Sequence, residues 1–141
     1  MSERNIIFTY QDHYGDYHME TIRASRAGTC YRIEGIPLFT PAISRGDIVS
    51  AIEEEDQLHF EMVLDSSGHS TIQVVFFDNR YLETALKDLE NMGCSWEASR
   101  EKRLVAVDVP DDVQYSLVLH YFEVGEEESK WTYKESCLSH Y

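Results

Sequence analysis

A short polar segment at the start of a predicted strand holds the residues best suited to chemistry. Gly68 is followed by His69, Ser70 and Thr71, so one imidazole and two hydroxyl groups stand next to one another. Histidine acts as a general base when a second group orients it. The same side chains can instead satisfy backbone groups where a turn joins two parts of a protein.

We favour the structural interpretation, because the local sequence places no carboxylate beside His69. A catalytic role would require a distant acid, such as Asp47, to be brought close to the imidazole by folding. We therefore name no catalytic residue and expect binding rather than catalysis. Whether His69 is functional or structural stays open at the level of sequence.

Other signatures of catalysis and metal binding are missing from the sequence. The histidines form no H-x-x-x-H or H-E-x-x-H pattern, and Cys30, Cys94 and Cys137 are widely spaced without a C-x-x-C. Such spacing favours neither a zinc site nor a disulfide framework. No G-x-S-x-G, phosphate-binding loop or G-x-G-x-x-G occurs. We expect no metal site, no cofactor, and cysteines that are buried thiols in a reducing cytoplasm.

The location follows from the absence of long apolar segments. No apolar core of a signal peptide follows the first residues, and no apolar run approaches the length of a membrane span. We therefore expect a cytoplasmic protein that does not contact membranes.

The charge balance is the most unusual property of the chain. Twenty-six Asp and Glu residues stand against 12 Lys and Arg, which gives a formal net charge of −14. A field of that sign repels nucleic acids and anionic lipids and attracts cationic partners. Three acidic runs in predicted connections are our candidate partner-binding residues: Glu53, Glu54, Glu55 and Asp56; Asp111 and Asp112; Glu126, Glu127 and Glu128.

Two interpretations of these runs stay open. Acidic runs that share one face would speed docking to a basic protein. Each run alone is also what an exposed, solvated connection looks like, so the acids can serve solubility only.

The first half of the chain has the periodicity of strands. Strands are predicted over residues 5–10, 18–24, 30–36, 48–52, 58–64 and 71–77. The run from Glu53 to Asp56 lies between two of these segments and would form the tip of a hairpin. Segment 71–77 is rich in β-formers, and we expect burial on both of its faces.

The second half changes to the periodicity of helices. Leu82, Ala85, Leu86 and Leu89 have the spacing of one helix face, which predicts a helix over residues 80–92 that ends at Gly93. Strands are predicted over 94–99 and 104–109, a second helix over 113–124, and a short third helix over 131–138. The order strand, helix, strand, strand, helix is most of a ferredoxin-like unit.

These elements predict an α+β fold class. We expect a single compact domain over residues 1–141, with a β-rich part over 1–66 and a partial ferredoxin-like βαββα part over 67–141. Neither part has enough apolar material to be stable alone, so the two are expected to share one core.

Several separated motifs follow one another along the chain. They are Tyr31-Arg32-Ile33-Glu34-Gly35-Ile36-Pro37-Leu38-Phe39, Gly46-Asp47-Ile48-Val49, Ser67-Gly68-His69-Ser70-Thr71, Gly93-Cys94, Leu104-Val105-Ala106-Val107-Asp108-Val109-Pro110 and Trp131-Thr132-Tyr133-Lys134-Glu135. In this order they resemble the bacterial family called domain of unknown function 4265, over residues 28–138. The resemblance implies a bacterial intracellular protein and supplies no catalytic residue.

Our leading functional hypothesis is an immunity or antitoxin protein that neutralises a basic toxin domain, such as a nuclease, by direct binding. Small size, an excess of acid and the lack of a catalytic signature motivate it. One alternative is a small-molecule-binding or regulatory domain without catalysis, which rests on fold analogy. Another is an enzyme that uses His69. The identity of the partner and the oligomeric state stay open.

Overall fold

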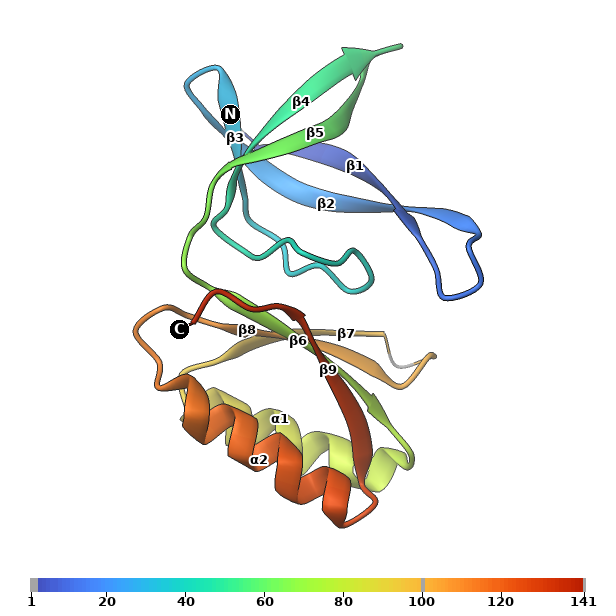
Figure 1. Cartoon of the computed structure of the whole chain (residues 1–141), viewed down its shortest axis with the longest axis vertical. Helices are drawn as coiled ribbons and strands as arrows, with labels where there is room; N and C mark the ends of the chain where they lie inside the picture. Colours follow the sequence, from blue (N-terminus) through green and yellow to red (C-terminus); the bar gives the residue numbers. More distant parts are fainter. Residues whose placement is uncertain (1–2, 100, 141) are drawn as a thin grey trace.

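Alternating apolar side chains close the first half of the chain into a five-stranded β-barrel (Figure 1). The computed structural model describes residues 3–99 and 101–140. The barrel strands are β1 (Glu3–Gln11), β2 (Tyr17–Ala27), β3 (Cys30–Ile33), β4 (Ile48–Glu54) and β5 (Gln57–Asp65). Each strand pairs antiparallel with the next, and a short parallel pairing of β1 with β5 closes the barrel. The interior is filled by buried side chains that include Ile6, Phe8, Ile22, Ala24, Ile33, Val49 and Leu58.

The second half forms a sheet that carries helices on one face. Its elements are β6 (Ser70–Phe76), a 3₁₀ turn η1 (Asn79–Tyr81), α1 (Leu82–Asn91), β7 (Ser95–Ser99), β8 (Leu104–Val109), α2 (Tyr115–Glu127) and β9 (Trp131–Cys137). The strand order is β7-β8-β6-β9, and all neighbours are antiparallel. Both helices lie on the face turned away from the barrel, so the layers are barrel, sheet and helices (Figure 1).

The central strand β6 is covered on both sides, as its composition predicts. Ile72 and Val74 pack into the core beneath the helices. Thr71 and Gln73 point the other way and hydrogen bond to the barrel half through Ile43 and Leu38. Strand β6 is thus apolar toward the helices and polar at Thr71 and Gln73 toward the barrel.

The α+β class and the strand-rich first half are confirmed. The hairpin tip at Glu55 and Asp56 is also confirmed, since both residues form the turn between β4 and β5. The first helix lies where the periodicity predicts it, and the Asp78 side chain caps its 3₁₀ entry by accepting a hydrogen bond from Arg80 N at 2.9 Å. The second helix begins and ends a few residues later than predicted, at Tyr115 and Glu127.

The predicted third helix over residues 131–138 is wrong, because this segment is strand β9. It pairs antiparallel with β6 from Trp131 to Cys137 and supplies the fourth strand of the sheet. Its side chains alternate, with Trp131 buried and Thr132 and Lys134 exposed. A short aromatic segment near a chain end has no strong period of its own, so the open edge of β6 decides its structure.

Position 125 in α2 requires glycine because the Trp131 ring packs directly against it. A Cβ atom at this position would lie 1.9 Å from Cζ2 of the Trp131 ring. The indole is 2% exposed and donates a hydrogen bond from Nε1 to the carbonyl oxygen of Phe122 at 3.0 Å. The ring therefore has no room to move, and the helix passes directly over it.

Replacing Gly125 with alanine is predicted to destabilise the protein by ~2 kcal/mol or more, through overpacking against Trp131. The direction of the change in stability is informative, because Gly→Ala at an unobstructed helix position stabilises a protein by about 1 kcal/mol. Chemical unfolding measures the difference. The matched control is Glu127→Ala on the exposed face of the same helix, which should change stability by less than about 0.5 kcal/mol. Equal stability of Gly125→Ala and wild type would contradict the packing described here.

Candidate functional site

The loop between β3 and β4 lies between the barrel and the sheet, where it builds a polar junction (Figure 1). We use the term junction for the following set of hydrogen-bonded residues: Ser44, Asp47, Ser67, His69, Ser70, Thr71, Asp108 and His140. They come from the loop, from the segment joining β5 to β6, from β6 and β8, and from the segment after β9. The segment 69–71 singled out by the sequence is therefore at the centre of the molecule.

The loop is held in shape by a carboxylate of the barrel. Glu20 on β2 accepts hydrogen bonds from the backbone N–H groups of Leu38, Phe39 and Thr40 at 2.8, 3.1 and 2.9 Å. It also accepts the Thr40 hydroxyl at 2.7 Å. These charge-assisted bonds tie the loop to the barrel wall and leave its following residues, 43–47, to face the sheet.

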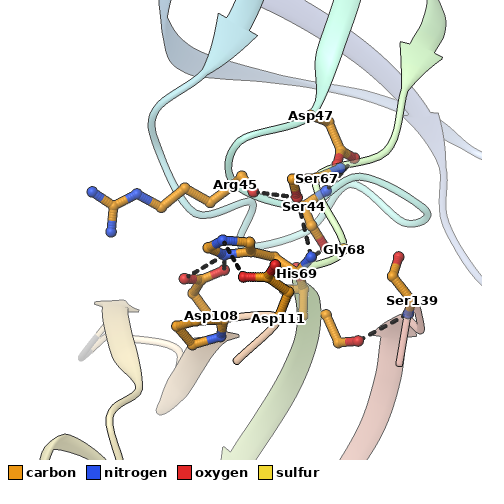
Figure 2. Close-up of polar contacts among 12 residues, drawn as sticks. Ser44, Arg45, Asp47, Ser67, Gly68, His69, Asp108, Asp111 and Ser139 are labelled. Atoms are coloured by element: carbon orange, nitrogen blue, oxygen red, sulfur yellow. Dashed lines mark hydrogen bonds and ion pairs between the residues drawn. The ribbon is translucent and has the colours of Figure 1, made fainter. Parts of the chain in front are cut away.

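The imidazole of His69 is paired with a buried carboxylate from β8. Its Nδ1 lies 2.9 Å from Oδ1 and 3.1 Å from Oδ2 of Asp108 (Figure 2). The Asp108 side chain is 1% exposed and that of His69 is 23% exposed. The other ring nitrogen, Nε2, lies 4.0 Å from Oδ1 of Asp111, whose side chain is largely exposed. One edge of the ring is thus fixed inside the protein and the other faces the surface.

Burial raises the pKa of the Asp108 carboxyl above its ordinary value. The hydrogen bond and charge of His69 act in the opposite direction, as does the positive charge of Arg45, while the negative charge of Asp47 adds to the rise. Desolvation is the largest of these effects, because the carboxylate has left water with few compensating donors.

A second buried carboxylate, Asp47, is not the partner of His69. Its Oδ2 accepts the backbone N–H of Ser44 at 3.0 Å and its Oδ1 accepts that of Ser67 at 2.9 Å. It therefore joins the barrel loop to the segment that leads into β6. This geometry does not support the catalytic alternative that pairs Asp47 with His69. The carboxylate that contacts His69 is Asp108.

The hydroxyl groups around His69 are all engaged in hydrogen bonds of the junction. Thr71 Oγ1 and Ser44 Oγ are 2.7 Å apart, and both residues are fully buried. Ser67 Oγ donates to the carbonyl oxygen of Arg45 at 2.8 Å and accepts the backbone N–H of His69 at 3.1 Å. The Ser44–Thr71 and Ser67–Arg45 bonds link segments that are distant in sequence, and the Ser67–His69 bond is local.

Ser70 connects the sheet to the end of the chain. Its Oγ lies 2.6 Å from Nδ1 of His140 and accepts the backbone N–H of Ser139 at 2.9 Å. His140 Nε2 in turn lies 2.8 Å from the carbonyl oxygen of Pro110. The segment after β9 is thus held against the start of β6 and the end of β8.

The arrangement orients an imidazole, as a base requires, but no hydroxyl of the junction is placed as a nucleophile for it. Ser67, Ser70 and Thr71 hold backbone or neighbouring side chains instead. Within residues 3–99 and 101–140, no group of three or more His, Cys, Asp and Glu side chains is placed to hold a metal ion. Burial raises the pKa of the Cys94 thiol to about 11, so this cysteine stays protonated at neutral pH.

The acidic runs lie at separate places in the fold. Residues 53–56 comprise the last two residues of β4 and the turn to β5, 111–112 lie in the connection from β8 to α2 beside the junction, and 126–128 lie at the end of α2. The first and the last of these runs lie at opposite ends of the long axis of the molecule (Figure 1). The structure therefore does not bring those two runs together.

The partner carboxylate of His69 is the residue that sequence reasoning missed. Asp108 is the one acid in a strand whose other members, residues 104–107 and 109, are all apolar and buried. A charged residue in such a strand signals a paired group, because an unpaired buried charge is very costly. Its pairing with His69 follows from the register of β6 with β8, which places Thr71 opposite Asp108.

Because burial dominates the rise in the pKa of Asp108, protonation of this carboxyl favours the folded state. The ordinary pKa is 3.8 and the folded value is higher, so the stability linked to this group is present below pH 3.8 and is lost as the pH rises through the folded pKa. Relative to Asp108→Asn, the wild type should thus lose stability as the pH increases across that window. Urea unfolding over a pH series measures the difference. If the wild type instead became more stable relative to Asp108→Asn as the pH increases, the raised pKa of Asp108 would be contradicted.

The Ser44–Thr71 contact is predicted to couple the barrel to the sheet. Ser44→Ala and Thr71→Val should each destabilise by about 1–2 kcal/mol, because Ser44→Ala removes one of the two hydrogen bonds of the buried Thr71 hydroxyl and Thr71→Val removes the Thr71 partner of both the Ser44 hydroxyl and the Ile43 carbonyl. The double variant should cost about 1 kcal/mol less than the sum. A double-mutant cycle of unfolding free energies measures this coupling. Strict additivity of the two substitutions would show that the hydroxyl pair carries no net interaction.

The chain was compared with solved structures and with curated proteins. The chain is similar to a solved structure from Neisseria gonorrhoeae, described as the novel crystal structure of a hypothetical protein, with a TM-score of 0.84 and 23% identity over 100% of this chain and 98% of that chain. At this identity the likeness shows the fold. Among curated proteins no sequence matches the chain. None of the helices in the described part of the chain is long and apolar enough to span a membrane.

The family model called domain of unknown function (DUF4265) matches residues 20–133, which include most of β2, the barrel strands β3 to β5, the loop of the junction and most of the sheet. Both buried carboxylates of the junction and His69 lie inside the matched region. The chain therefore belongs to the DUF4265 family, as its motifs predict.

Proposed function

We propose that the chain is an acidic binding protein for a basic protein partner, of the immunity or antitoxin type, which neutralises a toxin domain such as a nuclease by direct binding. The observation that carries the proposal is the position of the acids. Of the 26 Asp and Glu residues, all of which lie in the described part of the chain, Asp47 and Asp108 are the buried ones. The remaining acids are at least partly exposed to solvent.

An excess of exposed acid acts at a distance. It accelerates the encounter with a cationic surface and repels polyanions. Nuclease domains hold phosphate and present basic surfaces, so an acidic protein can cover such a surface where nucleic acid would bind. Because the runs 53–56 and 126–128 lie far apart, the charge supports attraction over much of the surface, and the contact itself requires a separate docking face.

The junction supports a binding role more than a catalytic one. Its hydrogen bonds join five segments of the chain, and its hydroxyl groups are engaged within it. His69 keeps one ring nitrogen toward the surface, beside Asp111. In our proposal this imidazole positions Asp108 and the β8 end of the junction and takes no part in a reaction.

The fold of the second half fits this role. We assign it to the ferredoxin-like type, supported by the element order β6-α1-β7-β8-α2-β9 and by the strand order β7-β8-β6-β9. Such a sheet presents one face of two helices to solvent, which is a common surface for protein contacts. The fold alone does not specify a function, so the proposal depends on the charge.

The proposal predicts a salt-dependent association with a basic protein. The chain, immobilised and exposed to an extract of its native host, should retain a partner of net positive charge, and the purified partner should bind with an on-rate that falls about tenfold or more between 50 and 500 mM salt. Stopped-flow fluorescence measures the rate. An on-rate independent of salt, or retention of anionic proteins only, would contradict the proposal.

A pair of charge-reversal variants serves as a control in the same measurement. Glu126, Glu127 and Glu128 are replaced by lysine in one variant, and Glu53, Glu54 and Glu55 in the other, so both change the net charge equally at opposite ends of the molecule. Both should slow association several-fold if the whole field steers the partner. A much larger effect of one variant would locate the contact near that end.

A further inference from the structure

An apolar groove runs between the two helices on the outer face of the protein. It has a volume of about 490 Å³. One side is formed by Tyr81, Ala85 and Met92 of η1, α1 and the residue after α1, and the other by Leu117, Tyr121 and Val124 of α2. The two helices that line it lie on the side of the sheet away from the barrel (Figure 1).

The groove is open because its floor is built from small residues over a large ring. Ala85 and Gly125 leave the space between the helices unfilled, and Trp131 closes it from below. The ring excludes any side chain at position 125, so the Gly125–Trp131 contact forms part of the groove lining.

Exposed apolar side chains lie along the α2 side of the groove. Leu117 is 60% exposed and Val124 is 37% exposed. Together with Tyr121 they are spaced at i, i+4 and i+7, which puts them on one face of the helix. Large apolar side chains that line an open groove in this way are typical of an interaction surface.

The helices around the groove are strongly acidic. Within their bounds, which the structure describes throughout, α1 carries three acids and one lysine, and α2 carries three acids and no lysine or arginine. At the rim, Asp88 accepts the Tyr121 hydroxyl at 2.7 Å, and Lys130 is paired with Glu128 at 3.0 Å. The groove therefore lies between two helices of net negative charge, with Asp88 and Glu128 as the acids of its own lining.

We propose that this groove binds an amphipathic helix of the basic partner, with the apolar ridge of that helix in the groove and its Lys or Arg residues against the acids of α1 and α2. A groove between two helices accepts apolar side chains at i, i+3, i+4 and i+7 of a third helix. The net negative charge of the helix layer selects basic flanks and opposes a second copy of this chain, because two acidic faces would repel each other. The inference rests on the proposed function for the charge of the partner.

The test uses synthetic peptides as probes. A fluorescein-labelled amphipathic helical peptide of leucine and lysine is titrated with the full chain, beside a peptide in which glutamate replaces lysine and a leucine–lysine peptide with a scrambled pattern. The amphipathic leucine–lysine peptide should bind most tightly by fluorescence anisotropy. Leu117→Gln should weaken it about tenfold, and Leu117→Gln with Val124→Gln about a hundredfold, because apolar contact in the groove is lost.

The matched control is Met62→Gln on β5. Met62 is 52% exposed, close to the exposure of Leu117, and lies on the barrel. Its substitution also leaves the net charge unchanged, and it should not alter the affinity. Unfolding midpoints of all variants establish that they fold, which is expected since the substituted side chains are exposed.

Three results would overturn the inference. Equal affinity of the Leu117 and Met62 variants for the leucine–lysine peptide would show that the peptide binds outside the groove. If salt abolished that binding, the proposed function as an acidic binding protein would be retained and the groove rejected. No binding of the leucine–lysine peptide by wild type would reject the groove, while the proposed function is judged by the partner recovered from the host. A wild-type dimer in analytical ultracentrifugation that Leu117→Gln dissociates would assign the groove to a second copy.

Discussion

Two carboxylates, Asp47 and Asp108, are buried where the barrel meets the sheet. A buried carboxylate is costly unless hydrogen bonds compensate for the water it has lost. Asp47 receives two backbone N–H groups from different segments, and Asp108 receives the imidazole of His69. These bonds can form only when the barrel loop, the start of β6 and β8 are all in place, so they fix how the two halves meet.

The polar junction also explains the division of the protein into faces. The sheet uses its apolar face to pack against the helices and its polar face to hold the barrel loop. The apolar core beneath the helices includes Trp131, whose ring fills the space next to Gly125, and the groove lies between the two helices. The groove and the junction thus lie on opposite sides of one sheet, which separates the proposed binding surface from the contacts that hold the fold.

Much of the fold follows from local sequence, and the site does not. Strand alternation in the first half and the stripe of Leu82, Leu86 and Leu89 correctly indicate the elements, because each pattern reports burial along one segment. Strand β9 was missed because its structure is decided by the unpaired edge of β6 rather than by its own period. The His69–Asp108 pair depends on strand register, which no local pattern contains.

The net charge follows from the composition, whereas the distribution of the charge over the surface depends on the fold. Runs at 53–56 and 126–128 invite the idea of a single acidic face, yet chain connectivity places them at opposite ends. The more informative acids are those spread over α1 and α2, because an apolar groove runs between them. That combination was invisible in sequence, since the two helices are separated by two strands.

The junction that holds the fold and the proposed outer binding face lie in different parts of the protein, and amide hydrogen exchange of the chain with and without the proposed basic partner tests this separation. The partner is predicted to slow exchange in α1 and α2, around Ala85 and from Leu117 to Val124, and to leave the amides of His69 and Thr71 unchanged. Protection centred on His69 and Asp108, with unchanged exchange in the helices, would contradict it.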